Sequence, residues 1–165
     1  MKPSVQIIYA EASYIASFHK ALGAVAAEKI YIESIEAPEL VDIEKFQLKL
    51  IADKAPTYYA VEGERVIGWC DISLKNNPRM KHRGGLGMGI VDGYRGQGIG
   101  TQLMTAALKH AKEIGLEKVE LSVYTSNVTA IALYRKLGFV EEGCIKSYRK
   151  LDGQDFDALT MARFL

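Results

Sequence analysis

The sequence predicts an α+β fold, in which a mixed, mostly antiparallel sheet of six to seven strands is flanked by helices. Strand patterns come in groups that helices separate, rather than alternating strictly with helices. Two tight-turn signals, Glu62-Gly63-Glu64 and Asp152-Gly153, each join two strand patterns as a hairpin. A glycine-rich strand also leads directly into an amphipathic helix. With 165 residues and no linker or repeat, the whole chain 1–165 is expected to form a single domain.

In the N-terminal half, two helices and three strands are expected. The expected elements are a strand at 5–10, a helix at 11–22 that Gly23 interrupts, a helix at 40–53 that Ala55-Pro56 breaks, and strands at 58–61 and 66–74. The first helix places Ile15, Phe18 and Leu22 on one face, which is the pattern of a helix that packs on a core. Residues 24–37 are ambiguous, because their first half could extend that helix while Ile30-Tyr31-Ile32 favours extended structure.

The most informative stretch runs from Gly84 to Met104 and reads GGLGMGIVDGYRGQGIGTQLM. It predicts a strand, a glycine-rich turn and the first turn of a helix. The helix is indicated by apolar residues that recur on one face, namely Ile99, Leu103, Ala107, Ala111 and Ile114. Gly115 then supplies a C-terminal stop.

The turn before this helix predicts an anion-binding site. The first N–H groups of a helix have no partner within it, and the positive end of the helix dipole points outward there. Glycines at 96, 98 and 100 remove the Cβ atoms that would keep phosphate oxygens away, and Arg95 adds a permanent positive charge. The alternative, that these glycines only permit a sharp turn, stays open.

The glycine spacing excludes the two common nucleotide-binding motifs. Gly93 and Gly98 have the spacing of G-x-x-x-x-G-K-[ST], but isoleucine stands where that motif needs lysine. Gly96 and Gly100 enclose a run that is one residue too short for G-x-G-x-x-G. What remains is R-x-x-G-x-G, formed by Arg95, Gly98 and Gly100.

In the C-terminal half, residues 118–124 alternate apolar and polar side chains and predict a strand. Thr125-Ser126-Asn127 is a helix-start signal, and Gly138 closes the helical spacing that follows it. Strands are expected at 139–148 and 156–165, joined by the second hairpin turn.

Two motifs together resemble the GNAT superfamily of N-acetyltransferases. The R-x-x-G-x-G run resembles the acetyl-CoA pyrophosphate loop of that family. The run from Asn127 to Phe139 resembles its second signature, roughly N-x-x-A-x-x-L-Y-x-K-x-G-F, and follows in the order that the family requires. Asp92 departs from the pattern, since a proline is common there, and the first 55 residues carry no comparable signature.

The resemblance implies the GNAT fold and acetyl-CoA as cosubstrate. The strand backbone would run beside the pantetheine arm, where Gly85, Gly87 and Gly89 leave one face bare. Asn127 would contact the pantetheine or the acetyl region, unless it only caps its helix. The implied cofactor-binding residues are Met88, Gly89, Ile90, Arg95, Gly96, Gln97, Gly98, Ile99, Gly100, Thr101, Asn127, Ala130 and Tyr134.

The implied reaction is direct transfer of an acetyl group to the primary amine of a small molecule, such as an amino acid, a polyamine or an amine-bearing antibiotic. A backbone N–H near Ile90 would stabilise the charge on the carbonyl oxygen. Tyr134 would be catalytic as a hydrogen-bond donor to the leaving thiolate, because a thiol pKa of about 8.5 lies below the tyrosine value of about 10. The alternatives are a protein N-terminal or lysine acetyltransferase and a non-catalytic acyl-CoA sensor.

The general base stays open. The candidates are Glu33, Glu36, His82 and Glu120, and a water relay is an equal alternative. Glu120 is the preferred catalytic candidate, because it lies on the polar face of the strand beside the predicted cofactor strand. A cysteine acyl-enzyme is disfavoured, because neither Cys70 nor Cys144 has an evident histidine base or helix start beside it.

Composition narrows the partners. A net charge of +1 gives no electrostatic reason to expect binding to nucleic acid or to an anionic membrane, and no apolar run approaches the roughly 20 residues of a membrane span. The segment Met1–Ser4 lacks a signal-peptide pattern, and the two cysteines form no framework, so a reducing cytoplasm is expected. No metal is expected, because His19, His82 and His110 are not at metal-binding spacing. Homodimers are common in the family that the chain resembles, so a second copy is a candidate partner.

Overall fold

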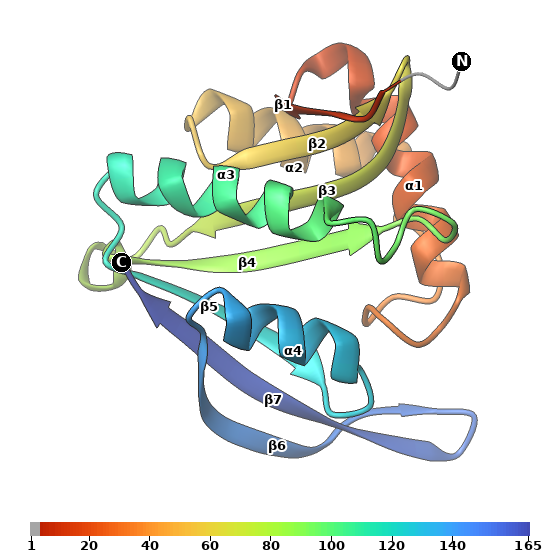
Figure 1. Ribbon diagram of the computed structural model, residues 1–165, viewed down its shortest axis with the longest axis vertical. Helices are drawn as coiled ribbons and strands as arrows, with labels where there is room; N and C mark the ends of the chain where they lie inside the picture. Colours follow the sequence, from red (N-terminus) through yellow and green to blue (C-terminus); the bar gives the residue numbers. More distant parts are fainter. Residues whose placement is uncertain (1–3) are drawn as a thin grey trace.

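The computed structural model describes residues 4–165, and Met1 to Pro3, which belong to the segment inspected for a signal peptide, lie outside the described residues. The helices and strands are, in chain order, β1 (Gln6–Tyr9), α1 (Ile15–Ala27), α2 (Leu40–Ala52), β2 (Thr57–Glu62), β3 (Arg65–Leu74), β4 (Arg83–Ile90), α3 (Ile99–Glu113), β5 (Lys118–Tyr124), α4 (Val128–Lys136), β6 (Val140–Leu151) and β7 (Gln154–Phe164). The seven strands form one sheet in the order β1-β2-β3-β4-β5-β7-β6 (Figure 1). This arrangement confirms the predicted α+β fold.

Helices cover both faces of the sheet (Figure 1). Successive side chains of a strand point to opposite faces, so β3 contributes to two cores. Trp69 packs with the buried residues of α1 and α2, such as Phe18 and Ile43. Cys70 and Ile72 face the other way and pack with α3 and α4. We refer to these as the α1/α2 face and the α3/α4 face.

The sheet divides where β4 meets β5. Within residues 4–165, this is the one neighbouring pair of strands that runs parallel, and its register covers only Arg83–Gly85 against Lys118–Glu120. Beyond this short contact the two strands diverge, as Figure 1 shows. In the described part of the chain, residues 86–90 of β4 therefore have no strand partner on the β5 side. We call this opening the β4–β5 gap.

The N-terminal helix differs from the prediction. Gly23 does not interrupt it, because α1 begins at Ile15 after a 3-10 turn at Ala12–Tyr14 and continues to Ala27. A glycine inside a helix costs only about 1 kcal/mol, and the fully buried Val25 and Ala26 hold the last turn on the sheet. None of the helices within residues 4–165 has the length and apolar character needed to cross a bilayer.

Candidate active site

The free edge of β4 presents backbone N–H groups to the gap. The Val91 N–H donates to the Ile67 carbonyl of β3 at 2.9 Å. Because the hydrogen-bonding direction alternates along an antiparallel strand, the N–H groups of Ile90 and Met88 point the other way, toward β5. These are two of the predicted cofactor-binding positions, and their backbone is placed where an extended ligand could pair with it.

The glycine stripe on β4 serves two purposes. A Cβ added to Gly89 would lie 2.3 Å from the Trp69 ring, so this glycine is needed for packing on the α1/α2 face. Gly87 is exposed, and an added Cβ there would meet only the Asp71 Oδ1 atom, at 3.6 Å. The prediction of a bare strand face is therefore correct at Gly87 and wrong at Gly89, where the Trp69 ring occupies the space that a side chain would take.

The glycine-rich loop and the start of α3 form an open helix terminus. Gly93, Gly96 and Gly98 have φ values of 86°, 72° and 78°, a left-handed conformation that favours glycine. The first intrahelical bond runs from the Gln102 N–H to the Gly98 carbonyl, so the N–H groups of the three preceding residues have no helical partner. The glycines thus do make a sharp turn, and the same turn exposes N–H groups that suit an anion. The three N–H groups belong to Ile99, Gly100 and Thr101. The cofactor-binding residues predicted from the sequence include these three and the loop residues 95–98 before them.

Gly100 is required by packing. A Cβ added there would lie 3.1 Å from the Leu133 side chain of α4 and 3.4 Å from Ile90 and Met88 of β4. Its absence allows the start of α3 to approach both elements. The open terminus of α3 is therefore held close to the edge of β4 that faces the gap.

The Arg95 side chain is committed to the protein rather than to the open terminus. Its guanidinium donates to both carboxylate oxygens of Glu28, at 2.6 and 2.9 Å, and lies 4.2 Å from the centre of the Tyr31 ring. Its Nε donates to the Ile90 carbonyl at 2.9 Å. The hydrogen bonds to Glu28 raise the pKa of Arg95 further. The positive charge predicted at the loop is thus present but paired with Glu28, and the role of Arg95 in cofactor binding stays a prediction.

Two residues of the second motif take different roles. The Asn127 Oδ1 accepts a hydrogen bond from the Ala130 N–H at 3.2 Å, so the helix-cap alternative is the interaction that the structure shows. Tyr134 lies on α4 with 7% of its surface exposed, and its ring is 5.9 Å from that of Phe139. Burial, and secondarily the neighbouring Cys70, raise the pKa of the Tyr134 hydroxyl. Tyr134 thus stays protonated at neutral pH and can donate a hydrogen bond.

The preferred base candidate, Glu120, is tied into ion pairs. Its carboxylate lies 3.2 Å from Arg83, 3.6 Å from Lys75 and 4.0 Å from Lys118, where β4 and β5 are still paired. These ion pairs join the carboxylate to the ends of β3 and β4 and to its own strand, and the catalytic role of Glu120 stays a prediction. Its position on the polar face of the strand could be predicted from the sequence, but its three partners could not.

The other base candidates lie elsewhere around the molecule. Glu33 accepts a hydrogen bond from the Tyr148 hydroxyl of β6. His82 is exposed just before β4, and Glu36 is exposed in the loop between α1 and α2. Cys70 is fully buried, and burial raises the pKa of its thiol, so it stays a neutral thiol as the disfavoured acyl-enzyme route implies.

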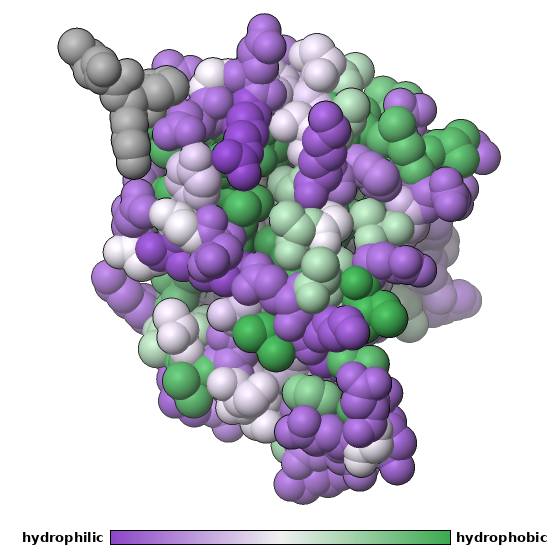
Figure 2. Space-filling model, turned by 90° about the vertical axis from the view of Figure 1, so that its right-hand side faces the viewer, coloured by the Kyte–Doolittle hydropathy of each residue, from purple (hydrophilic) through white to green (hydrophobic). Residues whose placement is uncertain are grey.

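Contacts that the sequence did not predict join the loop after α1 to β6. Arg149 of β6 donates to the carbonyls of Lys29 and Ile32, at 2.6 and 2.9 Å, in the loop that follows α1. Its guanidinium lies over the rings of Tyr124 and Phe156, at 4.7 and 4.5 Å. The β6–β7 hairpin therefore holds the first part of this loop, from Lys29 to Glu33. On this side of the molecule apolar residues are scattered among hydrophilic ones (Figure 2).

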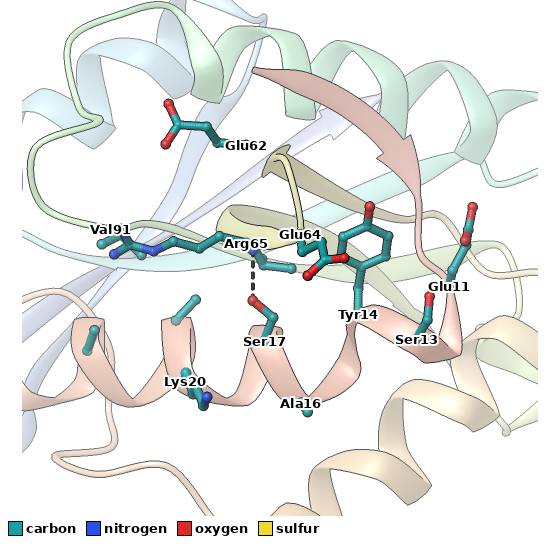
Figure 3. A pocket seen from close by; sticks show the side chains of 13 residues that line it. Glu11, Ser13, Tyr14, Ala16, Ser17, Lys20, Glu62, Glu64, Arg65 and Val91 are labelled. Atoms are coloured by element: carbon teal, nitrogen blue, oxygen red, sulfur yellow. Dashed lines mark hydrogen bonds between the residues drawn. The ribbon is translucent and has the colours of Figure 1, made fainter. Parts of the chain in front are cut away.

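A separate hollow of about 910 Å³ lies between α1 and the β2–β3 hairpin (Figure 3). Ser17 on its wall accepts a hydrogen bond from the Val66 N–H at 2.9 Å. None of its lining residues comes from β5 or α4, so it is distinct from the β4–β5 gap. Among residues 4–165, no group of three or more His, Cys, Asp or Glu side chains is placed to hold a metal ion.

Comparison with known proteins gives the same family from sequence and from structure. Residues 24–139 match the profile of the Acetyltransferase (GNAT) family. The chain is 30% identical over 104 residues to the L-amino acid N-acetyltransferase AaaT of Escherichia coli (strain K12), covering 62% of this chain and 64% of that protein. It is 39% identical over 103 residues to an N-alpha-acetyltransferase of Sulfurisphaera tokodaii, covering 58% of this chain and 61% of that protein. The match thus spans a little over six tenths of the length of each relative.

Solved structures extend the similarity over almost the whole chain. A GNAT-family acetyltransferase from Streptococcus pneumoniae superposes with a TM-score of 0.90 at 26% identity, covering 98% of this chain and 100% of that one. The acetyltransferase yncA from Salmonella typhimurium, solved with its cofactor acetyl-CoA, shares the fold with a TM-score of 0.90 at 14% identity, covering 98% of this chain and 94% of that one. The chain therefore belongs to the GNAT acetyltransferase family.

Proposed function

We propose that the protein transfers an acetyl group from acetyl-CoA to the primary amine of a small molecule. The observation that carries this proposal is the β4–β5 gap, whose free N–H groups at Met88 and Ile90 lie beside the open terminus of α3. An extended chain that ends in a diphosphate fits both features at once. Acetyl-CoA has this shape, and the family membership supports the same cosubstrate.

The proposed mechanism assigns one task to each part of the site. The N–H groups of Ile99 to Thr101 bind the pyrophosphate, and the edge of β4 pairs with the pantetheine arm. The Met88 or Ile90 N–H donates to the thioester oxygen as it gathers negative charge during attack by the amine. Tyr134 donates a hydrogen bond to the leaving sulfur. Because burial raises the pKa of Tyr134, donation without complete proton transfer is favoured.

The acceptor is proposed to be small because of the loop between α1 and α2. Arg149 fastens this loop to the β6–β7 hairpin through the carbonyls of Lys29 and Ile32. We infer that the loop held in this way limits the room for an acceptor at the open end of the gap. An amino acid, a polyamine or an amine-bearing antibiotic is the proposed class. The second candidate is a protein N-terminus, which the similarity to an N-alpha-acetyltransferase supports.

The test is acetyl-CoA-dependent release of free thiol across a panel of amino acids, polyamines, amine-bearing antibiotics and peptides with free N-termini. We expect release with at least one small amine and weaker release with the peptides. Release with peptides alone would favour the second candidate. Saturable coenzyme A binding with no release for any amine would contradict an enzyme and indicate an acyl-CoA sensor.

Tyr134→Phe is expected to lower kcat by about 10²-fold, the usual contribution of one positioned proton donor. The dissociation constant of coenzyme A should change less than about threefold, because the substitution removes only the hydroxyl and keeps the buried ring against Phe139. Steady-state kinetics and calorimetry measure the two quantities separately. Unchanged kcat would remove Tyr134 from the mechanism.

A further inference from the structure

A buried carboxylate lies beside the gap and takes no part in the mechanism above. Asp71 is in the middle of β3, opposite Gly87 of β4 in the strand register, and only 9% of its surface is exposed. Its Oδ1 atom is 3.6 Å from the point where a Gly87 Cβ would lie. Gly87 is exposed and belongs to the part of β4 that has diverged from β5. Residue 87 of β4 thus places no side chain over the Asp71 carboxylate on the side that leads to the gap.

Two fully buried polar side chains, Tyr59 and Gln47, lie on the same α1/α2 side of the sheet as this carboxylate. The Tyr59 hydroxyl of β2 donates to the Gln47 Oε1 of α2 at 2.7 Å. The same Gln47 amide lowers the pKa of the Asp71 carboxyl. Within residues 4–165, its buried Nε2 has no hydrogen-bond partner. A buried donor without an aligned acceptor is costly, and it favours a negative charge beside it.

We propose that Asp71 is the general base of the transfer reaction, and that Gln47 and Tyr59 are positioning residues that hold it beside the gap at Gly87. This assignment rests on the proposed function. It offers an alternative to Glu120, whose carboxylate is paired with three cations. The site therefore accepts a cationic primary amine whose nitrogen sits on the α1/α2 face of β4, next to Gly87.

The proton transfers balance as follows. One N–H bond of the ammonium breaks, and its proton passes through one water molecule to Oδ1 of Asp71. The neutral nitrogen then bonds to the thioester carbon, and the C–S bond breaks with its electron pair leaving on sulfur. The nitrogen loses a second proton as the amide forms, and this proton passes through water to the departing sulfur to give coenzyme A, while Tyr134 keeps its own proton. Asp71 returns its proton to solvent before the next turnover.

The protonation state of Asp71 suits this task. Burial raises the pKa of Asp71 to about 7, against the lowering effect of the Gln47 amide. A base works best when its pKa lies near the working pH. Two titratable groups interact with it: Tyr59 on the same face of the sheet, and Cys70, its neighbour in β3, on the opposite face. Burial and the Asp71 charge both raise their pKa values, so both stay neutral. Farther along the α1/α2 face, Lys75 and Glu120 pair with each other beside Gly85.

The test is the pH dependence of kcat/KM between pH 5.5 and 9.5, with the best amine of the panel. Wild type should lose activity below a midpoint near pH 7, in addition to any change from the amine itself. Asp71→Asn, which keeps the shape of the side chain, should lower kcat/KM at pH 7.5 by about 10²-fold and remove this acidic limb. Coenzyme A binding should change less than about threefold, because Asp71 lies away from the loop at residues 95–101.

Gln47→Met is the second variant, in case Asp71→Asn does not fold. It removes the amide that lowers the pKa of Asp71, so the acidic limb should move to higher pH without disappearing. If Gln47→Met lowers the rate but leaves the acidic limb of the pH profile where it is in wild type, Gln47 only supports the fold. If Asp71→Asn lowers the rate but keeps the acidic limb, Asp71 likewise only supports the fold. If wild type is active and Asp71→Asn is equally active, the role of Asp71 is overturned while the proposed function stands. Absence of thiol release from wild type would overturn the proposed function, and this role with it.

Discussion

Gly89→Ala is expected to lower the free energy of unfolding by about 3 kcal/mol, the upper end of the cost of overpacking a core. The added Cβ would lie 2.3 Å and 2.5 Å from two atoms of the Trp69 ring. That ring is 5% exposed and meets Phe18 edge to face at 5.4 Å, so it has no room to withdraw. Urea unfolding followed by circular dichroism measures the loss.

Gly87→Ala is the matched control two residues away on the same face. Its Cβ would meet the nearest atom, Asp71 Oδ1, at 3.6 Å, which is an ordinary contact. Its unfolding free energy should stay within about 1 kcal/mol of wild type, since glycine is a weak strand residue. Equal losses in the two variants would contradict the packing of Trp69 over Gly89.

Asp71→Asn is expected to stabilise the protein above pH 7 by up to about 4 kcal/mol. Burial raises the pKa of Asp71 from 3.8 to about 7, so between these values the folded state binds more protons than the unfolded state. The stability that this group contributes is fully present below about pH 4 and is lost as the pH rises through 7. Asparagine does not ionise and removes this loss.

Urea unfolding at pH 4.5, 6 and 8 measures the difference between wild type and variant. The difference in unfolding free energy between the variant and wild type should increase with pH up to about 7 and then level off. Glu44→Gln, at an exposed position of the same helix as Gln47, is the control and should show no such widening. A constant difference between Asp71→Asn and wild type across this range would contradict a raised pKa. If Asp71→Asn also loses turnover, the pH-dependent difference in stability would show that the protein keeps a destabilising carboxylate because the reaction needs a base.

Local patterns predicted the elements best where one face of a strand or helix is buried. The bounds of β5 agree with the prediction, because Val119, Leu121 and Val123 are buried and the polar residues Glu120 and Ser122 separate them. Gly23 predicts a break because glycine is a poor helix former, but burial of the following turn outweighs that preference. No local sequence pattern predicts the divergence of β4 from β5. It depends on how many residues pair between two strands that are distant in the chain.

The same limit applies to the candidate site. The sequence placed Arg95 at the loop, but its partner Glu28 is 67 residues away in the chain. Asp71 had a weak signal, since it is a lone carboxylate within an otherwise apolar strand, while Gln47 lies on a helix 24 residues earlier. The motifs identified the backbone that faces a cofactor, and long-range contacts decide which side chains remain free to act.

The most direct test of the central claim, that a diphosphate binds at the start of α3, is calorimetry of coenzyme A with Thr101→Asp and Thr105→Asp. Both add one negative charge to α3, at its third residue and at an exposed residue one turn later. A carboxylate in the first turn does not harm the helix itself, but it would repel a bound diphosphate by roughly 2–3 kcal/mol. We expect Thr101→Asp to weaken binding at least about tenfold and Thr105→Asp to bind within about threefold of wild type. Equal binding by wild type and both variants, or no saturable heat with wild type, would contradict the account.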